Sequence, residues 1–173
     1  SSLQAPCAYL DGEDGVYLIF NTKDANNTLV RKGAMTLMIH CTLENGELMF
    51  RPVDGVKNLY DKEEKKELSL AAFAPQAMKT RSNAFDLSLS IDMGYARSVV
   101  TKLLASDDGR EFVSVTVYRS VAFRGGNLMP KTFLSVDTTY NSLSPDAQGR
   151  MPEVCEIPCE DGKPVELRIF VDK

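Results

Sequence analysis

Apolar and polar residues alternate along several stretches of the chain, and this period-two pattern predicts β-strands. The clearest stretch is Phe85–Asp92, in which the alternation runs without a break. Because successive side chains of a strand point to opposite faces, its apolar set is predicted to form one buried face. That set is Phe85, Leu87, Leu89 and Ile91. Phe112–Tyr118 and Val165–Val171 repeat the pattern more loosely, as is typical of half-buried strands in antiparallel sheets.

Turn residues between these stretches predict hairpins. Asp107-Asp108-Gly109 follows a strand expected around Val99–Leu104, and Glu44-Asn45-Gly46 follows one expected at Ala34–Leu43. Both turns carry the Asx-Gly pattern of tight hairpins. Asp161-Gly162-Lys163-Pro164 separates the last two expected strands. About ten to twelve short strands with frequent turns predict an all-β fold, an antiparallel β-sandwich.

Three segments depart from the strand pattern. Val56–Lys66 has apolar residues at helical spacing before a charged run, which predicts a short solvated helix or a linker. Ala122–Lys131 contains Gly125-Gly126, and Thr138–Glu153 contains two prolines. Both are predicted to be long, irregular loops.

Composition limits the classes of protein that the chain can belong to. Its 173 residues are 43% hydrophobic and 25% charged, which suffices for one large domain, or for a small domain with an attached fragment. A net charge of −4 argues against a nucleic-acid partner, and no apolar run is long enough to cross a membrane. Ser1–Pro6 shows no signal-peptide pattern, so both a secreted and a cytoplasmic location stay open.

The thiols and the single histidine give little sign of a reactive site. The four cysteines are Cys7, Cys41, Cys155 and Cys159. The last two are four residues apart, which is neither the C-x-x-C spacing nor a zinc knuckle, and we expect all four to be buried or partly buried thiols. His40 and Cys41 are neighbours in an expected strand, so their side chains should point to opposite faces and form no dyad. We therefore expect a structural or solvent-facing role for His40.

Clustered carboxylates are the remaining candidates for catalysis or metal binding. They are Asp11, Glu13 and Asp14; Asp107, Asp108 and Glu111; and Glu153, Glu156, Glu160 and Asp161. All are expected in or beside turns, where acidic residues are common because they bond the local backbone, and none has the flanking aromatic residues of a sugar subsite. Neither Asp11–Asp14 nor Asp24–Asn27 matches an EF-hand loop. We therefore predict no catalytic, cofactor-binding or metal-ligating residue, and no cofactor.

Two stretches resemble a known family. The first is Arg31–Leu37 with Thr42–Leu48 and Arg51–Val53, and the second is Asp161–Lys173. Together with Phe85–Gly94, they resemble the C-terminal part of glycoside hydrolase family 32, the invertase, levanase and inulinase group. The family has a strand "G-x-M-(T/S)-L-P-R-E-L" and, later, a strand "L-R-I-F-V-D". This chain departs from the first motif, because Met38-Ile39-His40 stands where the family usually has Pro-Arg-Glu.

The resemblance implies two domains. In the family, a five-bladed β-propeller carries the catalytic acids and a β-sandwich follows it. Residues 1–33 would then be the end of the propeller, and residues 34–173 a concanavalin-like jelly-roll sandwich that lacks its last hairpin. The family's catalytic motifs, N-D-P-N-G, R-D-P and E-C, do not occur in this sequence. A missing terminal strand would leave an open sheet edge and apolar surface, so we expect a partner to cover them.

The function implied by the resemblance is that of a non-catalytic module of a fructan- or sucrose-hydrolysing enzyme of the β-fructofuranosidase type. The chain alone would be no enzyme, and would brace the propeller and contribute to a dimer interface. Expected partners are that propeller, a second copy or an exchanged strand, and a fructan; nucleic acid and membranes are not expected. The alternative is a lectin-like sandwich that binds carbohydrate without cleaving it. Its candidate aromatic residues are Tyr95, Tyr118, Phe123 and Tyr140.

Overall fold

The structure is a computed structural model that describes residues 3–13, 15–22, 34–78, 82–145, 151–159 and 162–171. In these ranges the chain forms eleven β-strands and one short 3-10 helix, and all the strand pairs are antiparallel. The predicted all-β, antiparallel fold class is therefore confirmed. The chain divides into two compact units, Ser1–Gln76 and Ala77–Lys173, which are described separately below.

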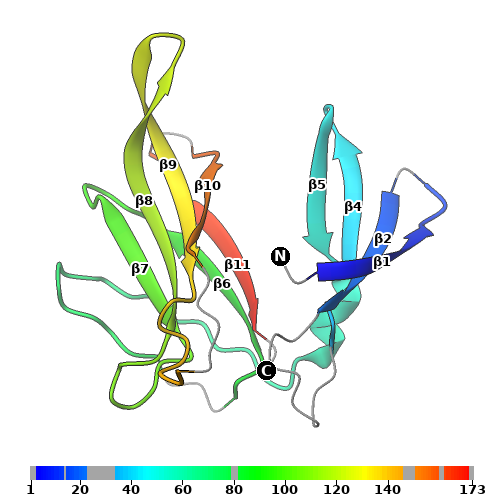
Figure 1. Cartoon of the computed structure of the whole chain (residues 1–173), viewed down its shortest axis with the longest axis horizontal. Helices are drawn as coiled ribbons and strands as arrows, with labels where there is room; N and C mark the ends of the chain where they lie inside the picture. Colours follow the sequence, from blue (N-terminus) through cyan, green and yellow to red (C-terminus); the bar gives the residue numbers. More distant parts are fainter. Residues whose placement is uncertain are drawn as a thin grey trace. The chain divides into compact units, whose positions relative to one another are not determined.

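The first unit is built on one antiparallel sheet with the strand order β1-β2-β4-β5 (Figure 1). Its strands are β1 (Leu3–Leu10), β2 (Gly15–Thr22), β4 (Ile39–Glu44) and β5 (Glu47–Pro52), and the two-residue β3 (Ala34–Met35) also pairs with β2. The hairpin predicted at Glu44-Asn45-Gly46 is confirmed. Asn45 and Gly46 have φ values of 51° and 83°, and a two-residue type I′ turn requires a positive φ at both positions.

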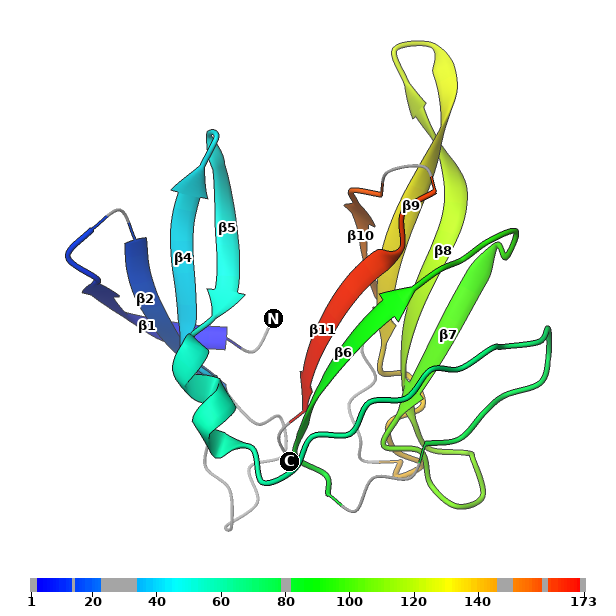
Figure 2. The same cartoon turned by 180° about the vertical axis from the view of Figure 1, so that it is seen from behind.

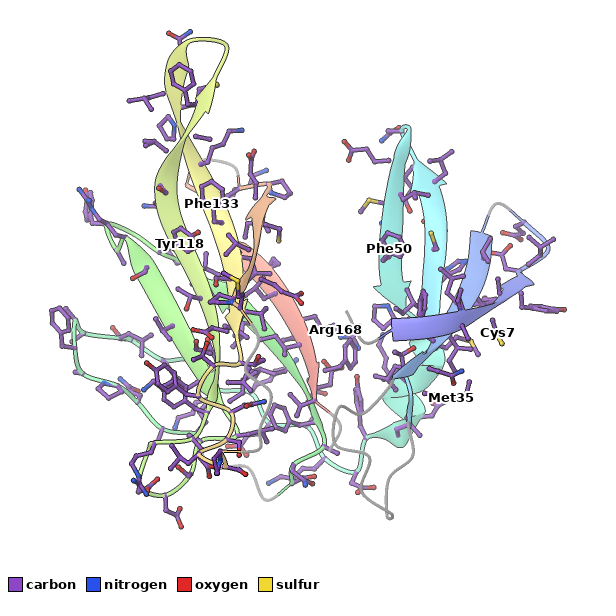
Figure 3. The ribbon with its side chains drawn as sticks, in the orientation of Figure 1. Cys7, Met35, Phe50, Tyr118, Phe133 and Arg168 are labelled. Atoms are coloured by element: carbon purple, nitrogen blue, oxygen red, sulfur yellow. The ribbon has the colours of Figure 1, made fainter. Side chains whose placement is uncertain are left out.

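The pairing register gives this sheet one apolar and one polar face. Cys41 lies opposite Val16 and Phe50, whereas His40 lies opposite Tyr17 and Arg51. Residues that are directly opposite share a face, and neighbours in a strand alternate between faces. The apolar face therefore includes Leu10, Val16, Leu18, Ile39, Cys41, Leu43, Leu48 and Phe50. Figure 3 labels Phe50, which belongs to the apolar face, and Cys7, which belongs to the other face.

The second unit contains two sheets. The larger has the order β10-β9-β8-β7, and the smaller consists of β11 and β6. The strands are β6 (Phe85–Ile91), β7 (Ser98–Leu103), β8 (Val113–Arg124), β9 (Asn127–Asp137), β10 (Glu153–Ile157) and β11 (Val165–Val171). The alternating segment Phe85–Ile91 is thus a strand, as predicted, and it pairs along its whole length with β11.

One apolar core joins the two sheets of the second unit. The core residues are Met93, Val117 and Val165, with Ile91, Val99, Leu134, Ile157, Cys159 and Leu167 packed against them. Because these side chains come from both sheets, the sheets pack face to face as a sandwich. The strands of the larger sheet are neighbours in chain order, which makes that sheet a meander. The jelly-roll connectivity implied by the family resemblance stays a prediction.

The prediction of a long, irregular loop at Ala122–Lys131 is wrong. Strands β8 and β9 continue through this segment and meet at a two-residue turn, Gly125-Gly126. Both glycines have positive φ, 54° and 85°, so the pair that suggested a loop instead forms a tight hairpin turn. Figures 1 and 2 show the resulting β8–β9 ribbon extending beyond β7 and β10.

Val56–Lys66, predicted as a short solvated helix or a linker, forms a short helix only at its start and continues as an exposed segment without helix. A 3-10 helix covers Asp54–Leu59 and buries Val56, and Tyr60 is extended. The charged run that follows is exposed and forms no helix. Its ion pairs, Lys62–Glu64 and Glu63–Lys65, join residues two positions apart, which do not face each other on a helix.

The expected division at residues 33 and 34 falls inside the first sheet. Strand β2 precedes that point and β4 follows it, yet the two pair over four residues of each strand. The compact units divide instead between Gln76 and Ala77. Of the second predicted loop, residues 138–145 and 151–152 contain no strand, Glu153 begins strand β10, and 146–150 lie outside the described residues. No helix in the described ranges is long and apolar enough to cross a membrane.

Candidate functional site

His40 lies on the polar face of the first sheet and is bonded to Asp11. Its Nε2 atom is 2.7 Å from Oδ2 of Asp11, and its ring stacks on Tyr17 with the centroids 4.7 Å apart. The other Asp11 oxygen accepts hydrogen bonds from the backbone N–H groups of Glu13 and Gly15. The bond from Glu13, followed by the one with His40, lowers the pKa of the Asp11 carboxyl. The pair fastens the β1–β2 turn to β4, which is a structural role for His40.

Cys41 takes no part in this cluster. It lies opposite Val16, whereas His40 lies opposite Tyr17, so the two side chains are on opposite faces, as predicted. Cys7 and Cys155 are exposed rather than buried, which corrects the expectation for these two thiols, while Cys41 and Cys159 are partly buried. In the described part of the chain, no group of three or more His, Cys, Asp or Glu side chains is arranged to hold a metal ion.

A second polar cluster on the same face joins β4 to β5. The Arg51 guanidinium donates to both carboxylate oxygens of Glu44, with Nη2 2.8 Å from Oε2. The Thr42 hydroxyl donates to Oε1 of Glu44 at 2.8 Å. These bonds, the one from Arg51 first, lower the pKa of Glu44 to about 2. This cluster could not be predicted from the sequence, because only the β4–β5 register places the three residues on one face.

Several turn carboxylates bond locally, as predicted. Asp108 accepts from the Ser106 hydroxyl and from Arg110, and these bonds lower its pKa. Glu111 departs from this pattern, because it accepts the backbone N–H of Leu143, 32 positions away, at 2.7 Å. Glu153 and Glu156 correct the prediction, because they lie in strand β10 rather than in a turn. Among the other predicted carboxylates, Asp14, Glu160 and Asp161 lie outside the described residues.

The strongest candidate for a ligand-binding surface is the outer face of the larger sheet in the second unit. Val117 is fully buried in the core, so the next residue, Tyr118, points outward. Tyr118 lies opposite Phe133, and their rings stack with the centroids 5.4 Å apart at 19° (Figure 3). Ser98 flanks Tyr118 on β7, and Glu156 flanks Phe133 on β10. One row across four strands thus carries a hydroxyl, two aromatic rings and a carboxylate.

A second aromatic pair lies at the other end of this outer face. The rings of Phe112 and Tyr140 stack with the centroids 5.4 Å apart, and the backbone N–H of Phe112 donates to the Tyr140 carbonyl at 2.7 Å. The Lys102 ammonium lies 3.9 Å from the Phe112 ring centroid. Phe112 and Tyr118 are six positions apart, which corresponds to roughly 20 Å along an extended strand.

Hydroxyl groups lie between the two aromatic pairs. Thr116 lies opposite Ser135, and Ser114 lies opposite Asp137. All four have the outward parity of Tyr118 and are partly exposed. We call the whole surface the aromatic face. It consists of Ser98, Val100, Lys102, Phe112, Ser114, Thr116, Tyr118, Phe133, Ser135, Asp137, Tyr140, Val154 and Glu156, of which Val100 and Val154 are exposed apolar side chains opposite Thr116 and Ser135.

The aromatic face contains two of the four aromatic residues that the sequence suggested for sugar binding. Tyr118 and Tyr140 belong to it. Tyr95 is fully exposed in the turn between β6 and β7, and Phe123 lies opposite Leu128 in the β8–β9 ribbon. Phe133 was not among the candidates predicted from the sequence. The alternation in Leu134-Ser135-Val136-Asp137, which puts Phe133 on the same side of the strand as Ser135, is the signal that could have revealed it.

The sequence matches no protein-family model, no curated protein and no solved structure.

Proposed function

We propose that this chain is a non-catalytic module of a fructan- or sucrose-hydrolysing glycosidase of the β-fructofuranosidase type. In that enzyme it braces the catalytic propeller and contributes to a dimer interface. The parent enzyme cleaves β-fructosidic bonds with two carboxylates, and those carboxylates belong to the propeller.

The observation that carries this proposal is the order of the two units. A five-stranded antiparallel sheet, in which β1-β2-β4-β5 are consecutive and the two-residue β3 also pairs with β2, is followed by a two-sheet sandwich. Blades of β-propellers are four-stranded antiparallel sheets, and the family that the sequence resembles has a propeller before a sandwich. On this proposal the last blade extends to Pro52, so that Met38-Ile39-His40 belongs to the blade.

The position of the stretch that resembles the family's L-R-I-F-V-D strand also supports the proposal. Leu167-Arg168-Ile169-Phe170-Val171 forms most of β11, which pairs with β6. The Arg168 guanidinium donates to the Asp86 carboxylate, with Nη2 2.7 Å from Oδ2, and lies 4.7 Å from the Phe170 ring centroid. Two of the stretches that carry the resemblance are therefore neighbours in one sheet (Figure 2).

The apolar face of the first sheet suits a bracing role. Phe50, Leu43 and Leu48 are 59%, 63% and 62% exposed. Antiparallel sheets usually cover one face with another layer, and exposed apolar patches mark contact surfaces. Under this proposal the covering layer is another part of the propeller. A second copy or an exchanged strand then pairs with the edge of the β6–β11 sheet.

The resolved carboxyl pKa shifts support a non-catalytic role. A glycosidase needs one carboxylic acid whose pKa is raised, so that it stays protonated to act as the general acid. The carboxyl pKa values of Asp11, Glu44, Asp108 and Asp137 are all shifted downward. These carboxylates suit structural hydrogen bonds better than proton donation.

The coding sequence upstream of Ser1 tests the proposal. We expect it to encode a propeller that contains the N-D-P-N-G, R-D-P and E-C motifs in that order. An upstream region without these three acidic motifs would contradict the assignment to a fructan-acting enzyme.

A further inference from the structure

We propose that the aromatic face binds a glycan chain, laid along β8 between the Tyr118–Phe133 and Phe112–Tyr140 pairs. The site itself is inferred from the geometry of the second unit alone. The choice of fructans as the first ligands to test rests on the proposed function.

The two aromatic pairs are the first argument, because they lie on the side of the sheet that faces away from the core. The inner side of β8 is filled by Val115 and Val117, which are 5% and 1% exposed. The rings of Tyr118 and Phe133 are therefore not needed to fill the core. Both side chains are partly exposed, and the aromatic surface that the stacking partner does not cover is apolar and carries partial negative charge, which suits the C–H groups of a sugar ring.

The hydroxyl groups between the pairs are the second argument. A ligand-binding surface usually combines apolar contact area with a few polar groups that fix orientation. Thr116, Ser135 and Ser114 each offer a hydroxyl group that can both donate and accept hydrogen bonds. A sugar presents hydroxyl groups at nearly every ring carbon and C–H groups on its ring faces, so hydroxyls flanked by the exposed side chains of Val100 and Val154 suit a polyol.

The positive and negative charges on this surface are balanced, which favours an uncharged ligand. The Lys131 ammonium, beside the face on β9, lies 2.7 Å from the Glu156 carboxylate, and the Lys102 ammonium lies over the Phe112 ring. Both ammonium groups already have a partner on the protein, and the net charge of the protein is −4. The surface therefore suits an uncharged ligand rather than a polyphosphate. The face spans roughly 20 Å, which is longer than a single sugar, so the ligand class is an uncharged oligo- or polysaccharide.

Isothermal titration calorimetry of the full chain with a panel of glycans tests the proposal. The panel consists of inulin, levan, cellohexaose, xylohexaose and maltohexaose. We expect the wild-type chain to bind at least one of them and Tyr118→Ala to weaken that binding about fivefold, which corresponds to about 1 kcal/mol, a typical contribution of an aromatic contact. Thr116→Val, which removes a hydroxyl with little change of shape, should also weaken it.

Tyr95→Ala is the matched control, because it removes an exposed tyrosine in a turn outside the sheet. Tyr118→Phe keeps the ring and should bind nearly as well as the wild type, which separates loss of the site from loss of the fold. The proposal is overturned if the wild-type chain binds no glycan of the panel, or if Tyr95→Ala weakens binding as much as Tyr118→Ala. It is also overturned if Tyr118→Ala changes only the oligomeric state, because the face would then be a protein interface.

The choice of glycan separates this inference from the proposed function. Binding of inulin or levan at the aromatic face supports both. Binding of only the glucan or xylan chains, with loss in Tyr118→Ala, supports the aromatic face and counts against a fructan-hydrolysing parent enzyme.

Discussion

The Nε2 atom of His40 lies 2.7 Å from Oδ2 of Asp11, although the two residues are 29 positions apart. The bond joins the β1–β2 turn to strand β4 and so connects the two sides of residues 33 and 34, where the family resemblance placed a domain boundary. Gly15 lies next to the Asp11–His40 bond. A Cβ atom at this position would be 2.3 Å from both the Asp11 and the His40 atoms.

Gly15→Ala should therefore destabilise the first unit. The added methyl group cannot fit without displacing the Asp11–His40 pair, and overpacking of this kind costs about 1–3 kcal/mol. Thermal unfolding followed by circular dichroism measures the change. Gly55→Ala is the control, because a Cβ there meets nothing within 4 Å. Equal effects of the two substitutions would show that the space above Gly15 is not restricted.

The Asp11 carboxylate should make the stability of the chain depend on pH in the acid range. Its folded pKa lies below the ordinary value of 3.8, so the unfolded chain binds its proton more readily than the folded chain. The carboxylate therefore stabilises the fold above the unfolded pKa, and this contribution is lost as the pH falls through the folded pKa. Denaturant unfolding of the wild type and Asp11→Asn across this range measures it. A stability difference between the two that does not narrow as the pH falls would refute the role of Asp11.

Glu44 should titrate with a pKa of about 2, because Arg51 and Thr42 bond its charged form. Carbon-detected NMR of the side-chain carboxyl measures this value directly. Arg51→Met should return the pKa of Glu44 toward its ordinary value of 4.5, since the first cause of the shift is removed. Because both side chains are exposed, we expect the stability of the protein to change little. A wild-type pKa near 4.5 would mean that the ion pair does not form in solution.

The sandwich core of the second unit should be sensitive at Val117. This side chain is 1% exposed and lies between the two sheets, so Val117→Ala should cost about 2 kcal/mol through lost burial and a residual cavity. Val100→Ala, at a position that is 52% exposed in the neighbouring strand, should cost much less. Urea unfolding measures both. If the two variants lose similar stability, the sheets do not pack through Val117.

The sequence predicts the strands well where only one face is buried. Phe85–Ile91 alternates cleanly because one side of β6 faces the core and the other faces solvent. The β8–β9 ribbon was missed because Gly125-Gly126 and Pro130 are typical of loops. The β10 ladder on β9 covers Thr132–Val136 and stops short of Pro130, so that the proline costs no bond to β10.

The candidate site could be predicted only in part, because it depends on register between distant strands. Tyr118 and Tyr140 can be selected from the sequence as aromatic residues near strand ends or loops. That Tyr118 lies opposite Phe133, with Glu156 beyond, follows only from the pairing of β8, β9 and β10. The Asp11–His40 bond could not be predicted either. It requires β2 to pair with β4, and these strands lie on opposite sides of residues 33 and 34, where the family resemblance placed a domain boundary.

Fructose release is the measurement that tests the central proposal most directly. The chain alone and a longer protein that includes the upstream coding region are each incubated with sucrose, inulin and levan. If this chain is a non-catalytic module of a fructan- or sucrose-hydrolysing enzyme, the longer protein releases fructose and the chain alone releases none. Fructose release by the chain alone, or by neither protein, would contradict the proposal.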